Sequence, residues 1–379
     1  MDKVYEDSLA LHKQNHGKLE IKSKVPVASR EDLSVVYTPG VGQVSIEIGK
    51  DKRLAKIYTI KHNSVAVVSD GSAILGLGNL GPEAAIPVME GKAILFKEFA
   101  NIDAFPICLD TQDVEEIIRT VKNIAPVFGG INLEDISAPR CFEIEKRLKA
   151  ELDIPVMHDD QHGTAVVVLA GLINALKLKG LAKEQARVIM NGAGAAGTAV
   201  TELLLEYGFG NVIVCDSAGA IYSGRTGLNE EKIKLAEKTN KNKVQGDLAN
   251  VLAGSDVFVG VSKGNILTKE MVQSMAAKPI IFALANPIPE IMPEIAVAAG
   301  AFVVATGRSD FPNQINNVLA FPGIFRGALD NNVRQITDSM LIAAAEALAA
   351  HVTDISPEKI LPNVFDKGVA ATVASVIID

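Results

Sequence analysis

Two pairs of adjacent acidic residues carry the strongest chemical signal in the sequence. Asp159 and Asp160 lie in the segment MHDDQHGTA, at the start of a long apolar stretch, and Glu134 and Asp135 lie upstream in INLEDISAPR. Adjacent carboxylates repel each other, and a bound divalent cation offsets that repulsion better than the positive end of a helix does. Oxygen-rich sites of this kind favour Mg²⁺ or Mn²⁺. The sequence therefore predicts that both pairs converge on one metal ion.

Two histidines beside the second pair support an alternative. His158 and His162 have the spacing of the two histidines in the HExxH zinc helix. Asp159 stands where that motif has glutamate, and Gly163 and Thr164 follow His162 directly. A zinc hydrolase is therefore the second interpretation. A solvated acidic turn would explain either pair alone, but the apolar flanks indicate strand ends inside a cleft.

A glycine-rich segment predicts a dinucleotide site. The residues GAGAAG follow an apolar strand pattern, open a helix without proline, and precede a second strand that ends in an aspartate. Glycines let the backbone approach a pyrophosphate at the helix N-terminus, and the acid accepts hydrogen bonds from the adenosine ribose. The predicted cofactor-binding residues of this unit are Gly192, Gly194, Ala195, Ala196, Gly197 and Asp216.

The charge of Asp216 favours NAD over NADP, because a phosphate on the ribose would face a like charge. Arg225, Lys232 and Lys234 lie close in sequence and would neutralise such a phosphate, so NADP stays open.

A second glycine-rich stretch, GLGNLG at 76–81, is followed by Pro82 and Pro87. Prolines inside a helix remove hydrogen bonds and clash with the preceding turn. We therefore expect a structural turn here, with no regular long helix after it.

The composition describes an ordinary globular protein. A chain of 379 residues with 48% hydrophobic and 22% charged residues has room for two domains. A net charge of −8, without a basic stretch interleaved with aromatics, argues against a nucleic-acid partner. The three cysteines, Cys108, Cys141 and Cys215, are widely spaced, which argues against a disulfide framework or a thiolate zinc site.

The remaining patterns concern location. The polar N-terminus argues against a secretory signal, and the most apolar stretch, 165–176, is too short to cross a bilayer and is typical of a buried helix. We expect a cytoplasmic protein without a membrane partner.

Strands and helices alternate along the chain, which predicts an α/β fold. Residues 1–160 are predicted to form a smaller substrate and metal domain, and residues 161–310 a doubly wound, Rossmann-type NAD(P)-binding domain. Residues 311–379 are predicted to supply a substrate-contacting loop and C-terminal helices that pack back on the first domain. The predicted strands are 65–69, 105–110, 154–157, 187–191, 212–215, 257–261, 280–285 and 302–305. The predicted helices are 3–15, 113–122, 141–151, 165–176, 197–207, 340–350 and 368–378.

Tyr37, in VYTPGVG, and Lys92, in EGKA, are candidate proton carriers only in combination with the metal and dinucleotide sites. Taken alone, a tyrosine is usually half-buried packing and a lysine usually a surface charge.

The chain closely resembles the malic enzyme family in its short bacterial form. The resemblance rests on blocks that occur in the same order over nearly the whole chain, namely YTPGVG, SDGSAILGLGNLG, EGKAILFK, INLEDISAPR, HDDQHGTA, GAGAAG, ALANP and INNVLAFPG. It implies oxidative decarboxylation of L-malate to pyruvate and CO₂, with NAD or NADP and with Mg²⁺ or Mn²⁺. It also implies a homodimer, to whose interface the helix at 3–15 is expected to contribute.

The resemblance implies roles for individual residues. The implied metal ligands are Glu134, Asp135 and Asp160, with Asp159 as a close neighbour. The implied general base is Lys92 and the implied general acid Tyr37. The implied substrate-contacting residues are Asn286, Asn317 and Lys92, and Asn286 is also expected at the cofactor because it follows the strand at 280–285.

The implied reaction requires particular chemical properties of Lys92, the metal and Tyr37. Lys92 takes the proton of the C2 hydroxyl only if its pKa falls from about 10.4 towards roughly 7 to 8. The metal chelates the C1 carboxylate and the C2 oxygen and stabilises the enolate that forms on loss of CO₂. Tyr37 then protonates C3.

One position departs from the family pattern. Larger members have a substrate-gripping arginine in the DGxRILGLG block, where this chain has Ala73. Arg140, close to Asp135 in sequence, is the candidate to replace it.

Two further alternatives for the function stay open, namely a malate dehydrogenase that stops at oxaloacetate and a non-catalytic NAD-binding regulator.

Overall fold

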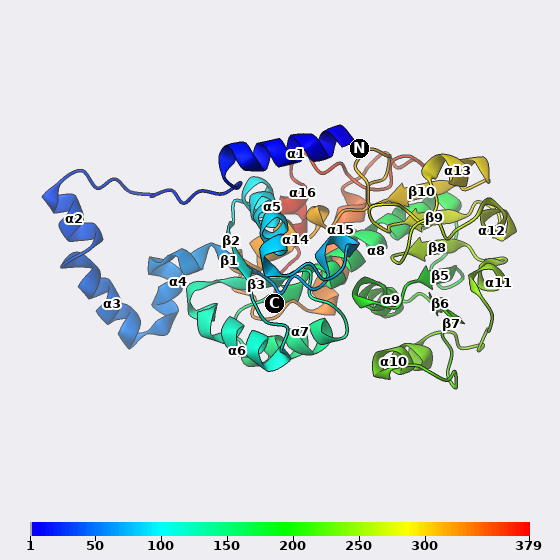
Figure 1. Cartoon of the computed structure of the whole chain (residues 1–379), viewed down its shortest axis with the longest axis horizontal. Helices are drawn as coiled ribbons and strands as arrows, with labels where there is room; N and C mark the ends of the chain where they lie inside the picture. Colours follow the sequence, from blue (N-terminus) through cyan, green and yellow to red (C-terminus); the bar gives the residue numbers. More distant parts are fainter. Residues whose placement is uncertain (1) are drawn as a thin grey trace.

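The computed structural model describes residues 2–379, in which two sheets are joined by one long helix (Figure 1). The first sheet is parallel throughout, with the strand order β2-β1-β3-β4. Its strands are β1 (Ser64–Ser69), β2 (Asp103–Cys108), β3 (Gly130–Leu133) and β4 (Val156–His158).

Helices cover both faces of the first sheet, because its central strand is apolar on both sides. Val65 and Val67 of β1 belong to the same core cluster as Phe96 of α5. Ala66 and Val68 belong to a second cluster with the apolar faces of α6 and α7. These helices are α5 (Pro82–Ala100), α6 (Val114–Ile124) and α7 (Arg140–Glu151).

Helix α5 corrects one prediction. The prolines after GLGNLG were expected to prevent a long helix, yet α5 runs for 19 residues through both of them. Pro82 occupies the first turn, where its missing N–H has no intrahelical partner anyway. Pro87 forfeits one hydrogen bond, and the buried face of the helix, which includes Met89 and Phe96, outweighs that loss.

The second sheet has the doubly wound order β10-β9-β8-β5-β6-β7. Its strands are β5 (Arg187–Asn191), β6 (Asn211–Asp216), β7 (Gly219–Ala220), β8 (Val257–Gly260), β9 (Ile280–Ala283) and β10 (Val303–Thr306). All pair in parallel except β7, a two-residue antiparallel strand that the sequence did not predict. Its helices are α9 (Ala195–Tyr207), α10 (Glu230–Lys238), α11 (Leu248–Leu252), α12 (Lys269–Ser274) and α13 (Pro293–Ala298). The α/β fold with a Rossmann-type domain is confirmed.

Helix α8 (Asp159–Lys179) starts directly after β4 and leads into the second sheet. It contains the apolar stretch predicted at 165–176. Within the part of the chain that the structure describes, α8 is the one helix whose length and composition would suit a membrane span, and 72% of its most apolar window is buried inside the protein.

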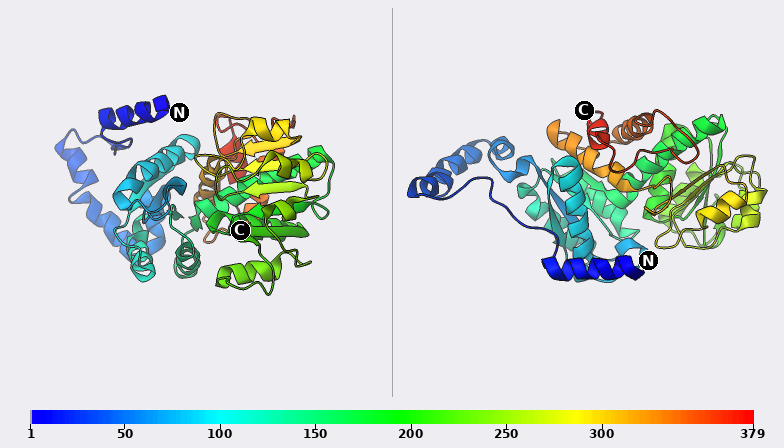
Figure 2. Two further views of the ribbon diagram at one scale, coloured as in Figure 1. Left: turned by 45° about the vertical axis from the view of Figure 1, so that its right-hand side comes forward. Right: turned by 90° about the horizontal axis from the view of Figure 1, so that it is seen from above.

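The C-terminal helices are α14 (Phe321–Asp330), α15 (Asp338–Ala350) and α16 (Val369–Ala374). Two of them, α14 and α16, return to the first half (Figure 2). Helices α14 and α16 pack on α5, and the rings of Phe321 and Phe325 meet Phe96 edge-on at 4.7 and 5.4 Å. Helix α15 packs on α8 instead, so the predicted return to the first domain holds for α16 and not for α15.

The N-terminal part does not join either core. Helix α1 (Asp2–Asn15) lies along one side of the protein, and α2 (Arg30–Val36), α3 (Gly40–Lys50) and α4 (Ala55–Tyr58) project away from it (Figures 1 and 2). We call residues 30–58 the arm. None of the residues in its three α-helices is buried, although the arm carries several large apolar side chains.

Candidate active site

A cavity of about 710 Å³ lies where the carboxyl ends of the two sheets face each other. From the first half, Glu134 and Asp135 follow β3, and Asp160 opens α8 directly after β4. Lys92 reaches the same cavity from α5. Parallel strands bring their carboxyl ends to one edge, so the two acidic pairs meet as the sequence predicted.

The second half closes the cavity from the other side. Asn286, after β9, and Asn317, in the turn before α14, both line it. Asn317 also donates a hydrogen bond through its side-chain nitrogen to Asp159 Oδ2. Asp159 itself is fully buried behind the lining residues.

Lys92 is held by two carboxylates. Its Nζ lies 2.5 Å from Asp159 Oδ2 and 2.9 Å from Glu134 Oε1, and 4.4 Å from the centre of the Phe321 ring. Burial alone would lower the pKa of Lys92, but Asp159 and Glu134 outweigh it and raise that pKa above its ordinary value. The lowered pKa that the implied base role requires is therefore not present in this arrangement, because Asp159 and Glu134 place two anions on the ammonium.

The carboxylates crowd one another. Burial raises the pKa of Glu134 well above its ordinary value against the opposing charge of Lys92. Burial, with the charge of Asp160, raises the pKa of Asp135 to about 7. The backbone N–H of Asp135 donates to Asp160 Oδ2 at 2.9 Å, which fixes the two acids side by side.

The donor set fits a hard divalent cation. Asp135 Oδ2 and Asp159 Oδ1 are buried without a hydrogen-bond partner among the described residues. Unpartnered buried oxygens and raised carboxylate pKa values are both relieved by a cation. No three His, Cys, Asp or Glu side chains of residues 2–379 form a closed ligand group. The side chains must therefore rotate to bring the oxygens around one ion.

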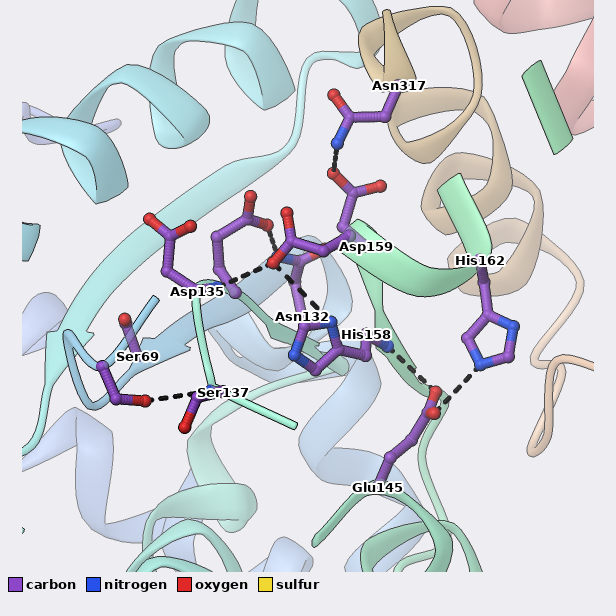
Figure 3. Close-up of polar contacts among 12 residues, drawn as sticks. Ser69, Asn132, Asp135, Ser137, Glu145, His158, Asp159, His162 and Asn317 are labelled. Atoms are coloured by element: carbon purple, nitrogen blue, oxygen red, sulfur yellow. Dashed lines mark hydrogen bonds and ion pairs between the residues drawn. The ribbon is translucent and has the colours of Figure 1, made fainter. Parts of the chain in front are cut away.

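Polar residues around the acids hold them in place (Figure 3). Asn132 donates to Glu134 Oε2 at 2.9 Å. Glu145 of α7 accepts the backbone N–H of His158 at 2.9 Å and pairs with His162 Nε2 at 2.9 Å. The sequence analysis missed Asn132 and Glu145, since neither belongs to a chemical motif.

The same geometry removes support from the zinc alternative. His158 ends β4 and lies outside the helix, whereas the HExxH motif needs both histidines on one helix face. His162 is occupied by Glu145.

A second cavity of about 820 Å³ surrounds the glycine-rich turn and is lined by Gly192, Gly194 and Asp216. Gly192 has a φ of +124°. A Cβ on Gly197 would lie 1.9 Å from the carbonyl oxygen of Gly192. These glycines therefore allow the tight turn into α9, which begins at Ala195. Ala196 lines the first cavity, whereas Ala195 and Gly197 line neither and act through the turn.

Two cations clamp Asp216 at the end of β6. Arg225 donates to Oδ1 and Lys232 to Oδ2, each at 2.7 Å. Burial alone would raise the pKa of Asp216, but Lys232 and Arg225 hold it below its ordinary value. Lys234 pairs with Glu231 instead and does not reach the aspartate.

The two cavities share Val261 and Ser262, which follow β8. Glu290, fully buried, accepts the backbone N–H of Ser262 at 3.1 Å and that of Ala285 at 3.0 Å, and so ties this loop to the one that carries Asn286. The sequence analysis did not single out Glu290. The cavity at Asp216 and the glycine-rich turn therefore adjoins the cavity at Lys92 and the acidic cluster.

Two predicted residues lie elsewhere. Arg140 donates to Asp70 Oδ2 at 2.9 Å and does not line the cavity, because the buried Asp70 carboxylate captures its guanidinium. The expectation that Arg140 replaces the family arginine is therefore wrong. Tyr37 ends α2 on the arm, is 65% exposed and does not line the cavity of its own chain. Ala73 does line it.

The fold and the site define an oxidoreductase that depends on a nicotinamide dinucleotide. Its acidic cavity lies next to the cavity at the glycine-rich turn. Family models described as "Malic enzyme, N-terminal domain" and "Malic enzyme, NAD binding domain" match residues 16–149 and 161–379. The chain belongs to the malic enzyme family, and the predicted family, enzyme class and dinucleotide dependence are confirmed.

Individual relatives agree over nearly the whole chain. The "Bifunctional malic/malolactic enzyme" of Bacillus subtilis is 58% identical over 98% of this chain and 92% of its own. The "NAD-dependent malic enzyme" of Geobacillus stearothermophilus is 59% identical over 96% of this chain and 76% of its own. The crystal structure of an NAD-dependent malic enzyme from Thermotoga maritima is 51% identical, with a TM-score of 0.95 over 97% of this chain and 98% of that one.

Proposed function

We propose that this chain oxidises L-malate to pyruvate and CO₂ with reduction of NAD, at the cavity that holds Lys92 and the acidic cluster. The adjacency of the two cavities, which share the lining residues Val261 and Ser262, carries this proposal. It lets a dinucleotide anchored at Asp216 extend its nicotinamide to the residues that handle the substrate proton. Family membership supports the same reaction.

Glu134, Asp135 and Asp160 are the side chains that would hold Mg²⁺ or Mn²⁺. The raised pKa values of Glu134 and Asp135 and the unpartnered oxygen of Asp135 support this assignment. When bound, the divalent ion supplies Lewis-acid stabilisation of negative charge on substrate oxygens.

Lys92 and Asp159 form the proton-handling pair. Burial raises the pKa of Asp159 against the charge of Lys92. An aspartate with a raised pKa, 2.5 Å from the ammonium, is placed to share its proton. Once Lys92 has passed one ammonium proton to the Asp159 carboxylate, its neutral amine can accept the proton of the C2 hydroxyl, while hydride would pass from C2 to the nicotinamide. Asn317 holds Asp159 in position.

NAD is the proposed cofactor because Asp216 presents a carboxylate where NADP carries its extra phosphate. Lys232, which lines the same cavity, is already neutralised by that carboxylate.

A homodimer is needed to bring Tyr37 to the reaction. Tyr37 lies on an arm that no part of its own chain covers, and the arm exposes apolar residues such as Val35 (74% exposed) and Ile57 (69% exposed). Exposed apolar surface of this kind marks an interface. We propose that a second copy covers the arm and that each arm delivers Tyr37 to the partner's cavity, where it protonates C3 after CO₂ is lost.

The activity is tested by following pyruvate and NADH formation from L-malate with Mn²⁺ and again with EDTA. We expect both products in equal amounts, and their loss with EDTA. Accumulation of oxaloacetate without pyruvate would instead support a dehydrogenase that does not decarboxylate, and metal-independent turnover would remove the acidic cluster from the mechanism.

The dimer is tested by mixing two inactive variants, Tyr37→Phe and Lys92→Ala. If each arm serves the partner, a mixed dimer contains one intact site, and equal mixing restores about a quarter of wild-type activity. If Tyr37 serves its own chain, every site of a mixed dimer lacks one group and activity stays absent. Light scattering on each sample checks that the species is a dimer.

A further inference from the structure

The charges that line the cavity do not match those of malate. Malate carries two carboxylates, and the cavity that would receive it is lined by the acids Glu134, Asp135 and Asp160. Lys92 is already paired with Asp159 and Glu134. The substrate carboxylate remote from the reacting hydroxyl therefore needs another cation.

Lys18 is the second lysine among the residues that line this cavity. It lies just after α1, on the segment that crosses α5, and no motif in the sequence drew attention to it (Figure 1). Its Nζ donates to the carbonyl oxygen of Pro87 at 2.7 Å. An ammonium has three N–H donors, so two remain for a ligand.

The segment around Lys18 is fixed by specific contacts. The backbone N–H of Lys18 donates to Glu90 Oε2 at 3.1 Å. Gly17 has a φ of +106°, and a Cβ there would lie 2.8 Å from Glu90 Oε1, so only glycine suits this close approach to α5. These contacts hold the chain against the helix that carries Lys92.

Lys18 Nζ lies beside Gly91 of α5. A Cβ on Gly91 would lie 3.5 Å from Lys18 Nζ. The ammonium therefore lies beside the residue that precedes Lys92 in α5, and both lysines line the cavity. Burial lowers the pKa of Lys18 against the opposing charge of Glu90, and an arriving carboxylate would favour the charged form.

We propose that Lys18 binds the C4 carboxylate of malate and thereby selects a dicarboxylate substrate. The inference rests on the proposed function of the cavity. Lys92 and the acidic cluster then handle the C1 and C2 end, while Lys18 holds the group that leaves as CO₂.

The test compares Lys18→Met, Lys18→Gln and Lys18→Arg by steady-state kinetics with saturating NAD and Mn²⁺. Loss of one charged hydrogen-bond partner should raise the KM for malate about 10- to 100-fold in the Met and Gln variants. Where hydride transfer limits the rate, the kcat should change by less than about threefold, because the C4 carboxylate keeps its charge in that step. Lys18→Arg keeps the charge and should stay near the wild-type KM.

Oxalate serves as the internal control, since it resembles the C1 and C2 end of the substrate and lacks the C4 carboxylate. Its inhibition constant should be unchanged in all three variants. The matched surface control is Lys22→Met, four residues further along the same segment and exposed, which should leave the KM for malate unchanged.

Three results would overturn the inference. The first is an unchanged KM in an active Lys18→Met enzyme. The second is a Lys18→Gln enzyme with the wild-type KM, because glutamine can keep the bond to the Pro87 carbonyl and Lys18 would then only position the chain. The third is equal weakening of malate and oxalate. A wild-type enzyme without malate turnover would overturn the proposed function as well, which distinguishes the two failures.

Discussion

Replacing Asp216 by asparagine should move the cofactor preference towards NADP. The substitution keeps the shape of the side chain and removes its charge. Lys232 Nζ lies 2.7 Å from Asp216 Oδ2, so a ribose phosphate that met the lysine would lie about two hydrogen-bond lengths, roughly 5 Å, from the carboxylate. Removing the carboxylate removes that repulsion and frees Lys232 and Arg225 for the phosphate.

The size of the effect follows from Coulomb's law. Two unit charges about 5 Å apart repel by about 1 kcal/mol in water and about 3 kcal/mol at an effective dielectric constant of about 20. This range corresponds to a change of roughly 5- to 150-fold in the dissociation constant. We expect the ratio of the NADPH dissociation constant to the NADH dissociation constant to be roughly 5- to 150-fold lower in Asp216→Asn than in the wild-type enzyme.

The measurement is direct titration of NADH and NADPH by the fluorescence of the dinucleotide, without malate or metal. The chain has no tryptophan, so the signal is free of energy transfer from that residue. Lys234→Met, two residues along α10 from Lys232, is the matched control and should not change the ratio. Adding Lys232→Met to Asp216→Asn should cancel the gain for NADPH. An unchanged ratio in Asp216→Asn, or a gain that survives loss of Lys232, would refute the reasoning.

Two further predictions concern the acidic cluster. Because burial and Asp160 raise the folded pKa of Asp135 to about 7, the folded protein binds protons more tightly than the unfolded chain, so without metal its stability should fall as pH rises from about 4 to 7. Mn²⁺ replaces those protons, and differential scanning fluorimetry should show a larger rise in Tm from Mn²⁺ at pH 8 than at pH 5; an equal rise at both would contradict this. Gly163→Ala should lower malate turnover at least about tenfold, since its Cβ would lie 1.9 Å from Asp159 Oδ1, although alanine favours a helix by about 1 kcal/mol. Activity of Gly163→Ala equal to that of the wild-type enzyme would show that Asp159 tolerates displacement.

The sequence predicted most strands of the two sheets because buried parallel strands are apolar on both faces, but β3 and β7 were not among the predicted strands. Strand β5 was predicted at its observed bounds, and the glycine-rich turn was recognised because Gly192 and Gly197 stand where only glycine fits. The convergence of the acidic pairs followed from the rule that the carboxyl ends of parallel strands share one edge.

The predictions were wrong where contacts between elements that are distant in the sequence determine the structure. Helix α5 tolerates Pro87 because its buried face contacts the sheet and α14, which no local pattern reveals. Arg140 was assigned by closeness in sequence, whereas Asp70, which captures it, lies 70 positions away. The raised pKa of Lys92 could not be predicted, because the two carboxylates that pair with it come from two other elements. Lys18 has no sequence signal, since only the crossing of α5 brings it to the cavity.

The most direct test of the central claim is Mn²⁺ binding followed by electron paramagnetic resonance, in which free Mn²⁺ gives the signal. The account predicts that the wild-type enzyme binds one Mn²⁺ per chain and that Asp135→Asn and Asp160→Asn each weaken that binding at least about tenfold, while the control Asp113→Asn, at the start of α6, does not. Equal Mn²⁺ binding by wild type and both cluster variants would contradict the claim that acids from the first half hold a metal beside the dinucleotide of the second.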